Sequence, residues 1–160
     1  MKDNWFNDIK NEIDGIIGEG VAATYNQELE MWIGSLNQIN YSEGYWIKLI
    51  PDTQITFNML GFPYDDNIIY NLDEGFNLIS YIGQDELSLD DAVPEEFLDN
   101  ITAIIGEGVA ASPNPNGSGE WVGSLNALNF GDGYWVKAIS STDFYWEQGI
   151  ENNFILKKSN

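Results

Sequence analysis

Residues 13–23 read Ile-Asp-Gly-Ile-Ile-Gly-Glu-Gly-Val-Ala-Ala, and residues 101–111 read Ile-Thr-Ala-Ile-Ile-Gly-Glu-Gly-Val-Ala-Ala. Nine of these 11 positions are identical. A second block follows each copy: Trp-Ile-Gly-Ser-Leu-Asn-Gln-Ile-Asn-Tyr-Ser-Glu-Gly-Tyr-Trp-Ile-Lys at 32–48 returns at 121–137 with ten of 17 positions identical. Self-similarity at a nearly fixed spacing is the signature of a tandem repeat. The sequence therefore predicts two similar structural units in series.

The spacing between the copies shows where their boundaries and loops lie. The first blocks are 88 residues apart and the second blocks 89, so one residue has been inserted between Ala111 and Trp121. The inserted region, Ser-Pro-Asn-Pro-Asn-Gly-Ser-Gly, is rich in turn-forming residues, as expected of a loop. We divide the chain into an incomplete first unit at 1–62, a second unit at 63–149, and a C-terminal strand at 150–160 that begins a further unit or is donated to a neighbour.

The second copy shows the elements expected of a complete unit. Its β-branched and aromatic runs, separated by Gly and Asp-Gly, predict strands. Ser88 is a good N-cap for a helix, and Pro94 should divide that helix into two short turns. The fold class is mainly β (α+β), with two small antiparallel β-meander units that each carry one short helix. The expected segments are strands at 76–82, 101–111 with a bulge at Gly-Glu-Gly, 121–125, 134–139 and 144–146, and a helix at 89–98.

The first copy lacks the opening strand that residues 76–82 supply in the second, although residues 4–13 correspond to the helix. We therefore expect an open sheet edge near Ile16, Ile17 and Trp32. The C-terminal residues Phe154, Ile155 and Leu156 form an apolar strand without an obvious partner, and an open edge with a free strand favours strand addition. We expect association with protein, either with copies of this chain or with a larger parent polypeptide. Closure of the edge by the same chain's own C-terminus is the alternative.

The composition excludes several classes of function. The chain has 160 residues, 26 of them acidic and only 6 basic, with no His and no Cys and a net charge of −20. All the basic residues are Lys. Such a charge repels nucleic acids and anionic membrane surfaces. Without His or Cys the usual zinc sites and the Ser–His–Asp and Cys–His nucleophiles are excluded. No run approaches the roughly 18 apolar residues of a membrane span, so we expect no membrane insertion.

Acidic residues supply the remaining chemistry, and we interpret them as structural. Glu19 and Glu107 recur in both copies, as do Glu43 and Asp132, but two complete glycosidase sites would leave little room for a cleft. The Gly-Glu-Gly-Val-Ala-Ala stretch matches the dinucleotide fingerprint only superficially, because a hairpin rather than a helix follows it. We expect no catalytic residue, no cofactor, and no hydrolase, transferase or redox activity. Calcium binding by carboxylates stays an open alternative, with no ligand set assigned.

Repeated aromatic residues are the sharpest chemical feature of the sequence. Outward-facing rings could stack on sugars, and inward-facing rings would build the core that so small a unit needs. We favour packing, with cores centred on Trp32 with Trp46 and on Trp121 with Trp135. The candidate binding rings are Trp32, Tyr45, Trp46, Trp121, Tyr134 and Trp135.

The stretch Glu-Gly-Phe-Asn-Leu-Ile-Ser-Tyr (74–81), followed by the Ile-Ile-Gly-Glu-Gly-Val-Ala-Ala, Trp-Val-Gly-Ser-Leu and Gly-Tyr-Trp-Val-Lys motifs, resembles a repeat of marine bacterial and bacteriophage proteins. In those proteins it occurs in large extracellular, cell-surface or virion-associated polypeptides, often in tandem. The resemblance implies that the chain is a module of a larger extracellular, cell-surface or virion protein, and it implies no catalytic activity. It favours a non-catalytic structural module of an extracellular, cell-surface or virion assembly or filament. A carbohydrate-binding module is the alternative.

Overall fold

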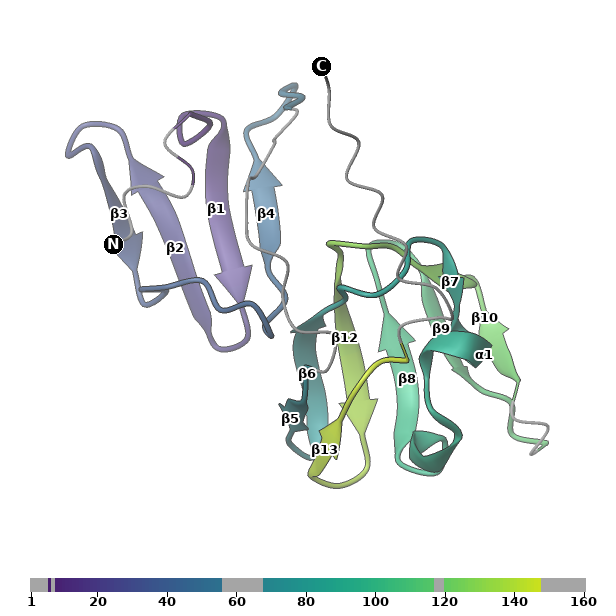
Figure 1. Cartoon of the computed structure of the whole chain (residues 1–160). Helices are drawn as coiled ribbons and strands as arrows, with labels where there is room; N and C mark the ends of the chain where they lie inside the picture. Colours follow the sequence, from purple (N-terminus) through teal and green to yellow (C-terminus); the bar gives the residue numbers. More distant parts are fainter. Residues whose placement is uncertain (1–5, 7, 56–67, 117–119, 148–160) are drawn as a thin grey trace, which may run out of the picture.

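The computed structural model describes residues 6, 8–55, 68–116 and 120–147. Within these residues the protein is mainly β, and its two large sheets are antiparallel (Figure 1). The first sheet comes from the N-terminal part of the chain, and the second from the part after residue 68. The strand segments assigned to the C-terminus, including Phe154, Ile155 and Leu156, lie outside the described residues.

The first sheet has four strands in the order β3-β2-β1-β4. Neighbouring strands β1, β2 and β3 form a meander, and β4 returns to pair with the other side of β1. The prediction placed the open edge near Ile16, Ile17 and Trp32. Ile16 and Ile17 lie on β1 in the middle of the sheet, so that part of the prediction was wrong, whereas Trp32 lies on β3, which is one edge strand; the other edge strand is β4. The strands are β1 (Ile13–Gly18), β2 (Val21–Asn26), β3 (Met31–Gly34) and β4 (Trp46–Leu49).

The second sheet repeats this order and adds one strand, giving β10-β9-β8-β12-β6. Strands β8, β9, β10 and β12 carry the sequence blocks that correspond to β1, β2, β3 and β4. The additional strand β6 covers residues 76–80 of the opening strand predicted at 76–82, and it pairs with β12 along its whole length. The strands are β6 (Gly75–Ser80), β8 (Ile101–Ile105), β9 (Ala110–Pro113), β10 (Trp121–Gly123) and β12 (Gly133–Ala138).

The Gly-Glu-Gly motif is a hairpin turn, so the prediction of one bulged strand across 101–111 was wrong. In the second sheet the chain reverses after β8, and the Gly106 N–H donates to the Val109 carbonyl at 2.9 Å. The second glycine of the motif has a positive φ in both copies, +67° at Gly20 and +70° at Gly108. Glycine adopts a positive φ without strain, so this residue allows the chain to reverse direction. The strand therefore ends at the motif, and a tight hairpin turn follows.

The helical segment is short and divided, as the sequence predicts. Strand β7 (Leu87–Ser88) leads into α1 (Leu89–Ala92), and the 3-10 turn η1 (Glu95–Phe97) follows Pro94. The Ser88 hydroxyl caps α1 by accepting the Asp91 N–H at 3.2 Å. Residues 8–12, where the first copy was expected to end its helix, form turns, so the described residues contain only one α-helix. Two small sheets complete the fold: β11 (Ala127–Leu128) with β7, and β13 (Thr142–Phe144) with β5 (Tyr70–Leu72).

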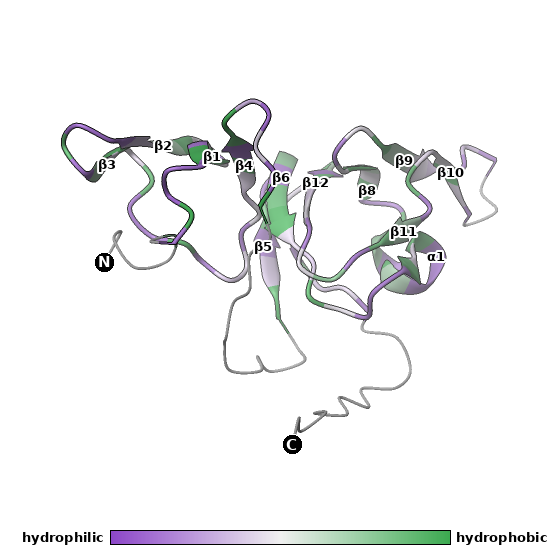
Figure 2. Ribbon diagram, turned by 90° about the horizontal axis from the view of Figure 1, so that it is seen from above, coloured by the Kyte–Doolittle hydropathy of each residue, from purple (hydrophilic) through white to green (hydrophobic). Residues whose placement is uncertain are grey.

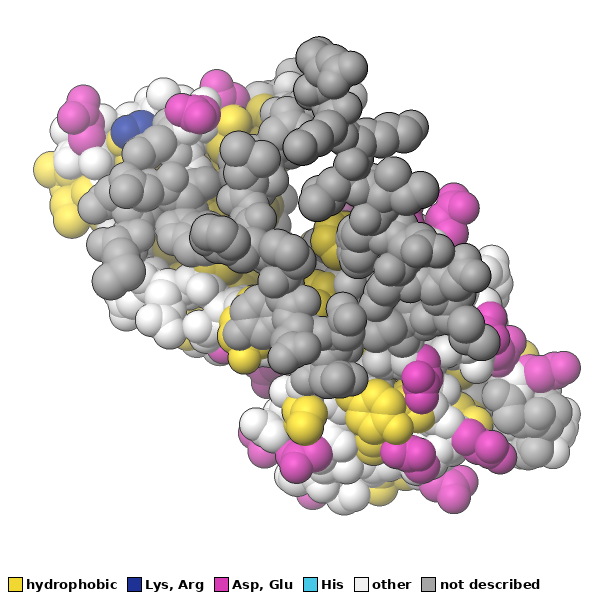
Figure 3. Space-filling model, in the orientation of Figure 1, with side chains coloured by type: hydrophobic (Ala, Val, Ile, Leu, Met, Phe, Trp, Pro, Cys, Tyr) yellow, Lys and Arg dark blue, Asp and Glu magenta, His cyan; other side chains and the backbone are white. Residues whose placement is uncertain are grey.

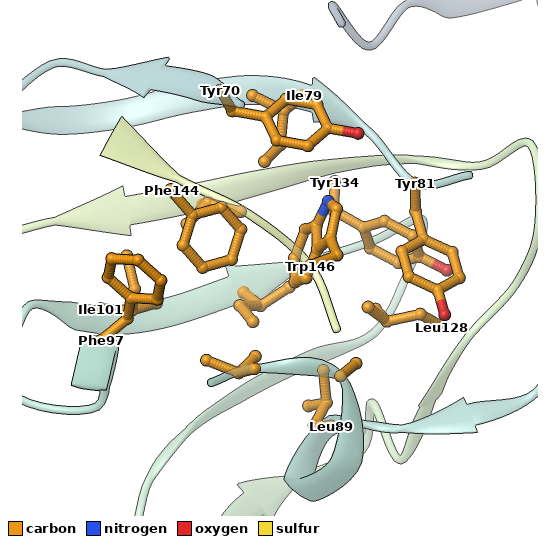
Figure 4. Packing of buried hydrophobic residues seen from close by; sticks show 14 of the residues in the cluster. Tyr70, Ile79, Tyr81, Leu89, Phe97, Ile101, Leu128, Tyr134, Phe144 and Trp146 are labelled. Carbon is orange, nitrogen blue, oxygen red and sulfur yellow. The ribbon is translucent and has the colours of Figure 1, made fainter. Parts of the chain in front are cut away.

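The larger core lies between the second sheet and the layer formed by α1, β5 and β13. Trp146 is at its centre, 2% exposed, with its ring edge-on to Phe144 and Tyr81 (Figure 4). Its indole N–H donates to the Ser80 carbonyl at 3.0 Å. The expectation that Trp135 centres this core was wrong, because Trp135 points to the other face of β12 and packs on Phe76. Trp121 lies at the margin of the same cluster.

Among the described residues, the buried cluster of the first sheet has fewer members than that of the second. Trp32 is 7% exposed and contacts the rings of Phe6 and Tyr25 edge-on, as expected of a core residue. Its expected partner Trp46 is only half-buried and is not part of this cluster. The buried members are Phe6, Ile13, Ile16, Ala23, Trp32 and Leu36.

The two sheets meet where residues 41–44, directly before β4, contact β6, so β4 and β6 appear as neighbours when the molecule is seen from above (Figure 2). Their corresponding strands run in opposite senses, since β4 points upward and β12 downward in Figure 1. Acidic side chains are scattered over the visible face rather than gathered in one patch (Figure 3). Among the described residues, no helix is long and apolar enough to cross a membrane.

We predict that Trp146→Ala lowers the free energy of unfolding by about 3–5 kcal/mol, because it removes a fully buried ring. Trp135→Ala is the matched control and should cost much less, since that ring is half-buried on the other face. Urea unfolding followed by circular dichroism measures both. An equal loss in the two variants would contradict this assignment of the core.

Candidate functional site

Strands β4 and β12 correspond in sequence but differ in their neighbours. Strand β12 lies between β8 and β6 and pairs with both. Strand β4 pairs with β1, and among the described residues it has no strand on its other side. An unpaired strand edge presents a row of backbone N–H and C=O groups that can accept a further strand. The free edge of β4 is therefore the first component of the candidate site.

Equivalent side chains on the two strands also differ in burial. Val136 on β12 is 0% exposed, whereas Ile47, which occupies the same position on β4, is 43% exposed. The residue two further along is the buried Ala138 in β12 and the half-buried Leu49 in β4. Apolar side chains that alternate along a strand normally face a core. Ile47 is thus exposed on the face of the sheet that, in β12, is turned to the larger core.

The backbone of β4 shows which groups face the free edge. The Ile50 N–H donates to the Glu12 carbonyl at 2.9 Å on the β1 side. Because alternate residues of a strand direct their N–H and C=O groups to opposite sides, Trp46 and Lys48 face β1, and Ile47 and Leu49 face away from it. The Ile47 N–H is therefore a donor on the free edge.

The outer edge of β6 shows how the first sheet already holds a strand of the second. The Leu78 N–H donates to Glu19 Oε2 at 2.9 Å, and the Gly44 N–H donates to the Leu78 carbonyl at 2.9 Å. The Ser80 hydroxyl and N–H donate to the carbonyls of Tyr41 and Ser42, at 2.6 and 3.4 Å. The backbone polar groups of Leu78 on this edge are thus satisfied by the first sheet.

The Leu78 side chain fits closely into this joint. Leu78 is 2% exposed, and a Cβ built on Gly44 would lie 3.0 Å from its Cγ and Cδ1. A side chain at position 44 would therefore displace Leu78. We call this arrangement of Glu19, Gly44 and the inserted Leu78 the Glu19 clamp.

A pocket of about 490 Å³ lies beside the free edge of β4. One wall is the start of β4, from Tyr45 to Ile47, and the opposite wall comes from the second sheet and its loops. The second wall includes Glu107 and Gly133, the counterparts of Glu19 and Gly44. The full lining is Tyr45, Trp46, Ile47, Gly106, Glu107, Val109, Leu125, Asn129, Gly131, Asp132, Gly133 and Tyr134.

The six candidate aromatic rings do not form an exposed strip. Trp32 and Tyr134 are buried, and Tyr45, Trp46, Trp121 and Trp135 are half-buried. Tyr45, Trp46 and Tyr134 line the pocket, whereas Trp32, Trp121 and Trp135 do not. Trp135 is edge-on to Phe76, with ring centroids 6.4 Å apart and planes at 89°. No ring of this set is fully exposed for stacking.

The repeated carboxylates Glu43 and Asp132 each bond to a tyrosine hydroxyl. Glu43 accepts the Tyr45 hydroxyl at 2.5 Å, and the corresponding Asp132 accepts the Tyr134 hydroxyl at 3.4 Å. Burial, together with the hydrogen bond to Glu43, raises the pKa of Tyr45 to about 12. Burial also raises the pKa of Tyr134. These contacts fix the two tyrosines, and the described residues contain no group of three or more acidic side chains placed to hold a metal ion.

No family model, curated protein or solved structure matches this chain.

Sequence reasoning found the strands that correspond between the two sheets but missed the pocket and the contact of Glu19 with Leu78. The signal was present: the Gly-Glu-Gly motif occurs twice, and we interpreted its glutamate only as a surface residue. Its function depends on the neighbouring sheet, since Glu19 bonds to Leu78, 59 residues away. No local pattern reports such a contact.

We predict that the protein loses stability between about pH 10 and pH 12. The folded state raises the pKa of Tyr45 from 10.0 to about 12, so it favours the neutral phenol. This contribution is fully present below the unfolded pKa and is lost as pH rises through the folded value. The midpoint of urea unfolding at a series of pH values measures the loss, and Tyr45→Phe should make the decline shallower. A Tyr45→Phe profile that parallels the wild type would contradict the assignment.

Proposed function

We propose that the protein is a non-catalytic structural module that joins protein to protein by strand addition at β4. The observation that carries this proposal is the unpaired edge of β4, whose counterpart β12 is completed by β6. On this proposal the two sheets are tandem units of one repeat, and the first unit lacks its opening strand. Backbone pairing would supply affinity, and alternate side chains would supply specificity.

The occupant that we propose is the C-terminal segment of a second copy, with Phe154, Ile155 and Leu156 as the assembly strand. This segment is apolar and ends in Lys157 and Lys158, two of the six basic residues of a chain with a net charge of −20. Its positive end would reduce the repulsion between two acidic molecules. The resemblance to repeats of extracellular, cell-surface and virion proteins supports an assembly in one of those locations.

The alternative, a carbohydrate-binding module, would use flat, accessible rings. The burial of Trp32 and Tyr134 and the edge-on packing of Trp135 on Phe76 favour the structural function over it. Glycan recognition would also need rings arranged in both units, and the half-buried rings near the pocket come mostly from the first sheet.

We predict that the full-length chain associates as salt is raised to about 1 M, because screening weakens the repulsion between acidic molecules. Light scattering measures the mass. Deletion of residues 152–160 should keep the chain monomeric. Ile47→Pro should do the same, because it removes the N–H that faces the free edge and leaves the β1 side intact.

Two controls make this test decisive. Circular dichroism and the urea midpoint must show that the deletion variant and Ile47→Pro stay folded, and Lys48→Pro, which removes a donor on the β1 side, should destabilise the sheet. A full-length chain that stays monomeric at millimolar concentration in high salt, with a deletion that only unfolds it, would overturn the proposal. Association that persists in Ile47→Pro would equally exclude β4 as the contact.

A further inference from the structure

The Glu19 clamp has a counterpart in the second sheet, and nothing described occupies it. Glu107 follows β8 as Glu19 follows β1, and Gly133 begins β12 as Gly44 precedes β4. Glu107 is exposed and makes no hydrogen bond or ion pair with any residue that the structure describes. Strand β8 pairs with β12 only as far as Ile105 opposite Trp135, so Gly133 lies beyond the last pair.

The two clamps face each other across a close approach of the chain. A Cβ built on Gly133 would lie 3.1 Å from the Gly44 Cα, so the starts of β12 and β4 touch. The corresponding strands run in opposite senses (Figure 1). In the first sheet, Glu19 and Gly44 thus contact β6, a strand of the second sheet. The second clamp lines the pocket that also contains the start of β4.

From this geometry we infer that the strand added to β4 is held along its outer edge by Glu107 and Gly133, as Leu78 is held by Glu19 and Gly44. The inference rests on the proposed function, because it concerns the strand that β4 accepts. In the existing joint, Leu78 stands opposite Trp135, and its N–H and C=O point away from β12. The equivalent residue of the added strand stands opposite Trp46.

The chemistry of the pocket matches one residue of an extended peptide. The Glu107 carboxylate accepts that residue's N–H, and the Gly133 N–H donates to its C=O. The side chain enters a pocket whose apolar lining includes Val109, Leu125 and Ile47. A medium-sized apolar residue such as Leu fits this description, whereas an acidic one would lie beside Glu107 and Asp132 and be repelled. The pocket therefore selects the residue opposite Trp46.

The probe for the added strand is a neutral peptide with the sequence of β6, acetyl-Gly-Phe-Asn-Leu-Ile-Ser-amide, because Leu78 of β6 makes the equivalent contacts in the existing joint. It is titrated into the ¹⁵N-labelled full chain in high salt. We expect amide shifts at Ile47, Leu49 and Gly133. A second peptide carries N-methyl-leucine, which removes only the N–H that Glu107 accepts. Loss of a hydrogen bond to a charged group corresponds to roughly ten-fold weaker binding.

A double-mutant cycle isolates the contact. The Glu107→Ala variant should bind the unmethylated peptide roughly ten-fold more weakly than the wild type does. The same variant should bind the methylated and the unmethylated peptide with equal affinity, because the carboxylate that distinguishes them is absent. Glu95→Ala, an exposed glutamate on η1 outside the pocket, is the matched control and should behave as wild type. A preserved spectrum in each variant shows that it remains folded.

The outcomes separate the two proposals. Shifts along β4 with equal affinity for Glu107→Ala and wild type would overturn the role of Glu107 and leave strand addition standing. An absence of shifts at both β4 and Gly133 would overturn the inference together with peptide addition at β4. Shifts at Gly133 alone, with β4 unaffected, would also contradict the inference, because the strand would then bind without the edge it is proposed to complete.

Discussion

Every extended strand has two edges of backbone donors and acceptors, and the structure depends on how β6 satisfies both. On one edge β6 pairs with β12 over six residues, from Gly75 opposite Ala138 to Ser80 opposite Gly133. On the other edge Glu19, Gly44 and Ser42 supply the partners. Because one strand completes the second sheet and also contacts the first, it links the two parts of the molecule. The same requirement applied to β4 leads to the proposed function.

The two sheets also differ in what covers their faces. The second sheet is covered by β5, β13 and α1, which place Phe144, Trp146 and Tyr81 over it (Figure 4). The first sheet has the same inward-facing positions, yet Ile47 is 43% exposed where Val136 is 0% exposed. Burial of apolar area is the main favourable term in folding, so we expect the first sheet to be the less stable half of the chain.

Much of this fold could be predicted from the sequence, because segments that recur in the repeated blocks mark where strands and turns lie. Hydrophobic alternation located the strands of the second sheet, and Ser88 with Pro94 predicted the divided helix. The Gly-Glu-Gly turn was misassigned as a bulge, because glycine within an apolar run is compatible with both, and only the paired strands distinguish them. The sequence predicted that Trp135 faces the core, but its neighbour Tyr134 does so instead. The register of a strand decides which of two adjacent aromatic residues is buried, and the sequence does not report that register. The pocket could not be predicted, because its two walls come from different sheets.

The opposite senses of β4 and β12 and the close approach of Gly44 and Gly133 bring equivalent segments of the two sequence blocks together at the joint between the sheets. A contact between equivalent surfaces closes on itself, unlike a head-to-tail contact, which propagates. On the proposed function, a strand added to β4 would contact Glu107 and Gly133 as Leu78 contacts Glu19 and Gly44, and the joint would then have no free strand edge for a third sheet. A longer assembly of this kind would be a series of such pairs of sheets joined by the donated segments, with the pair rather than the single sheet as its repeating element.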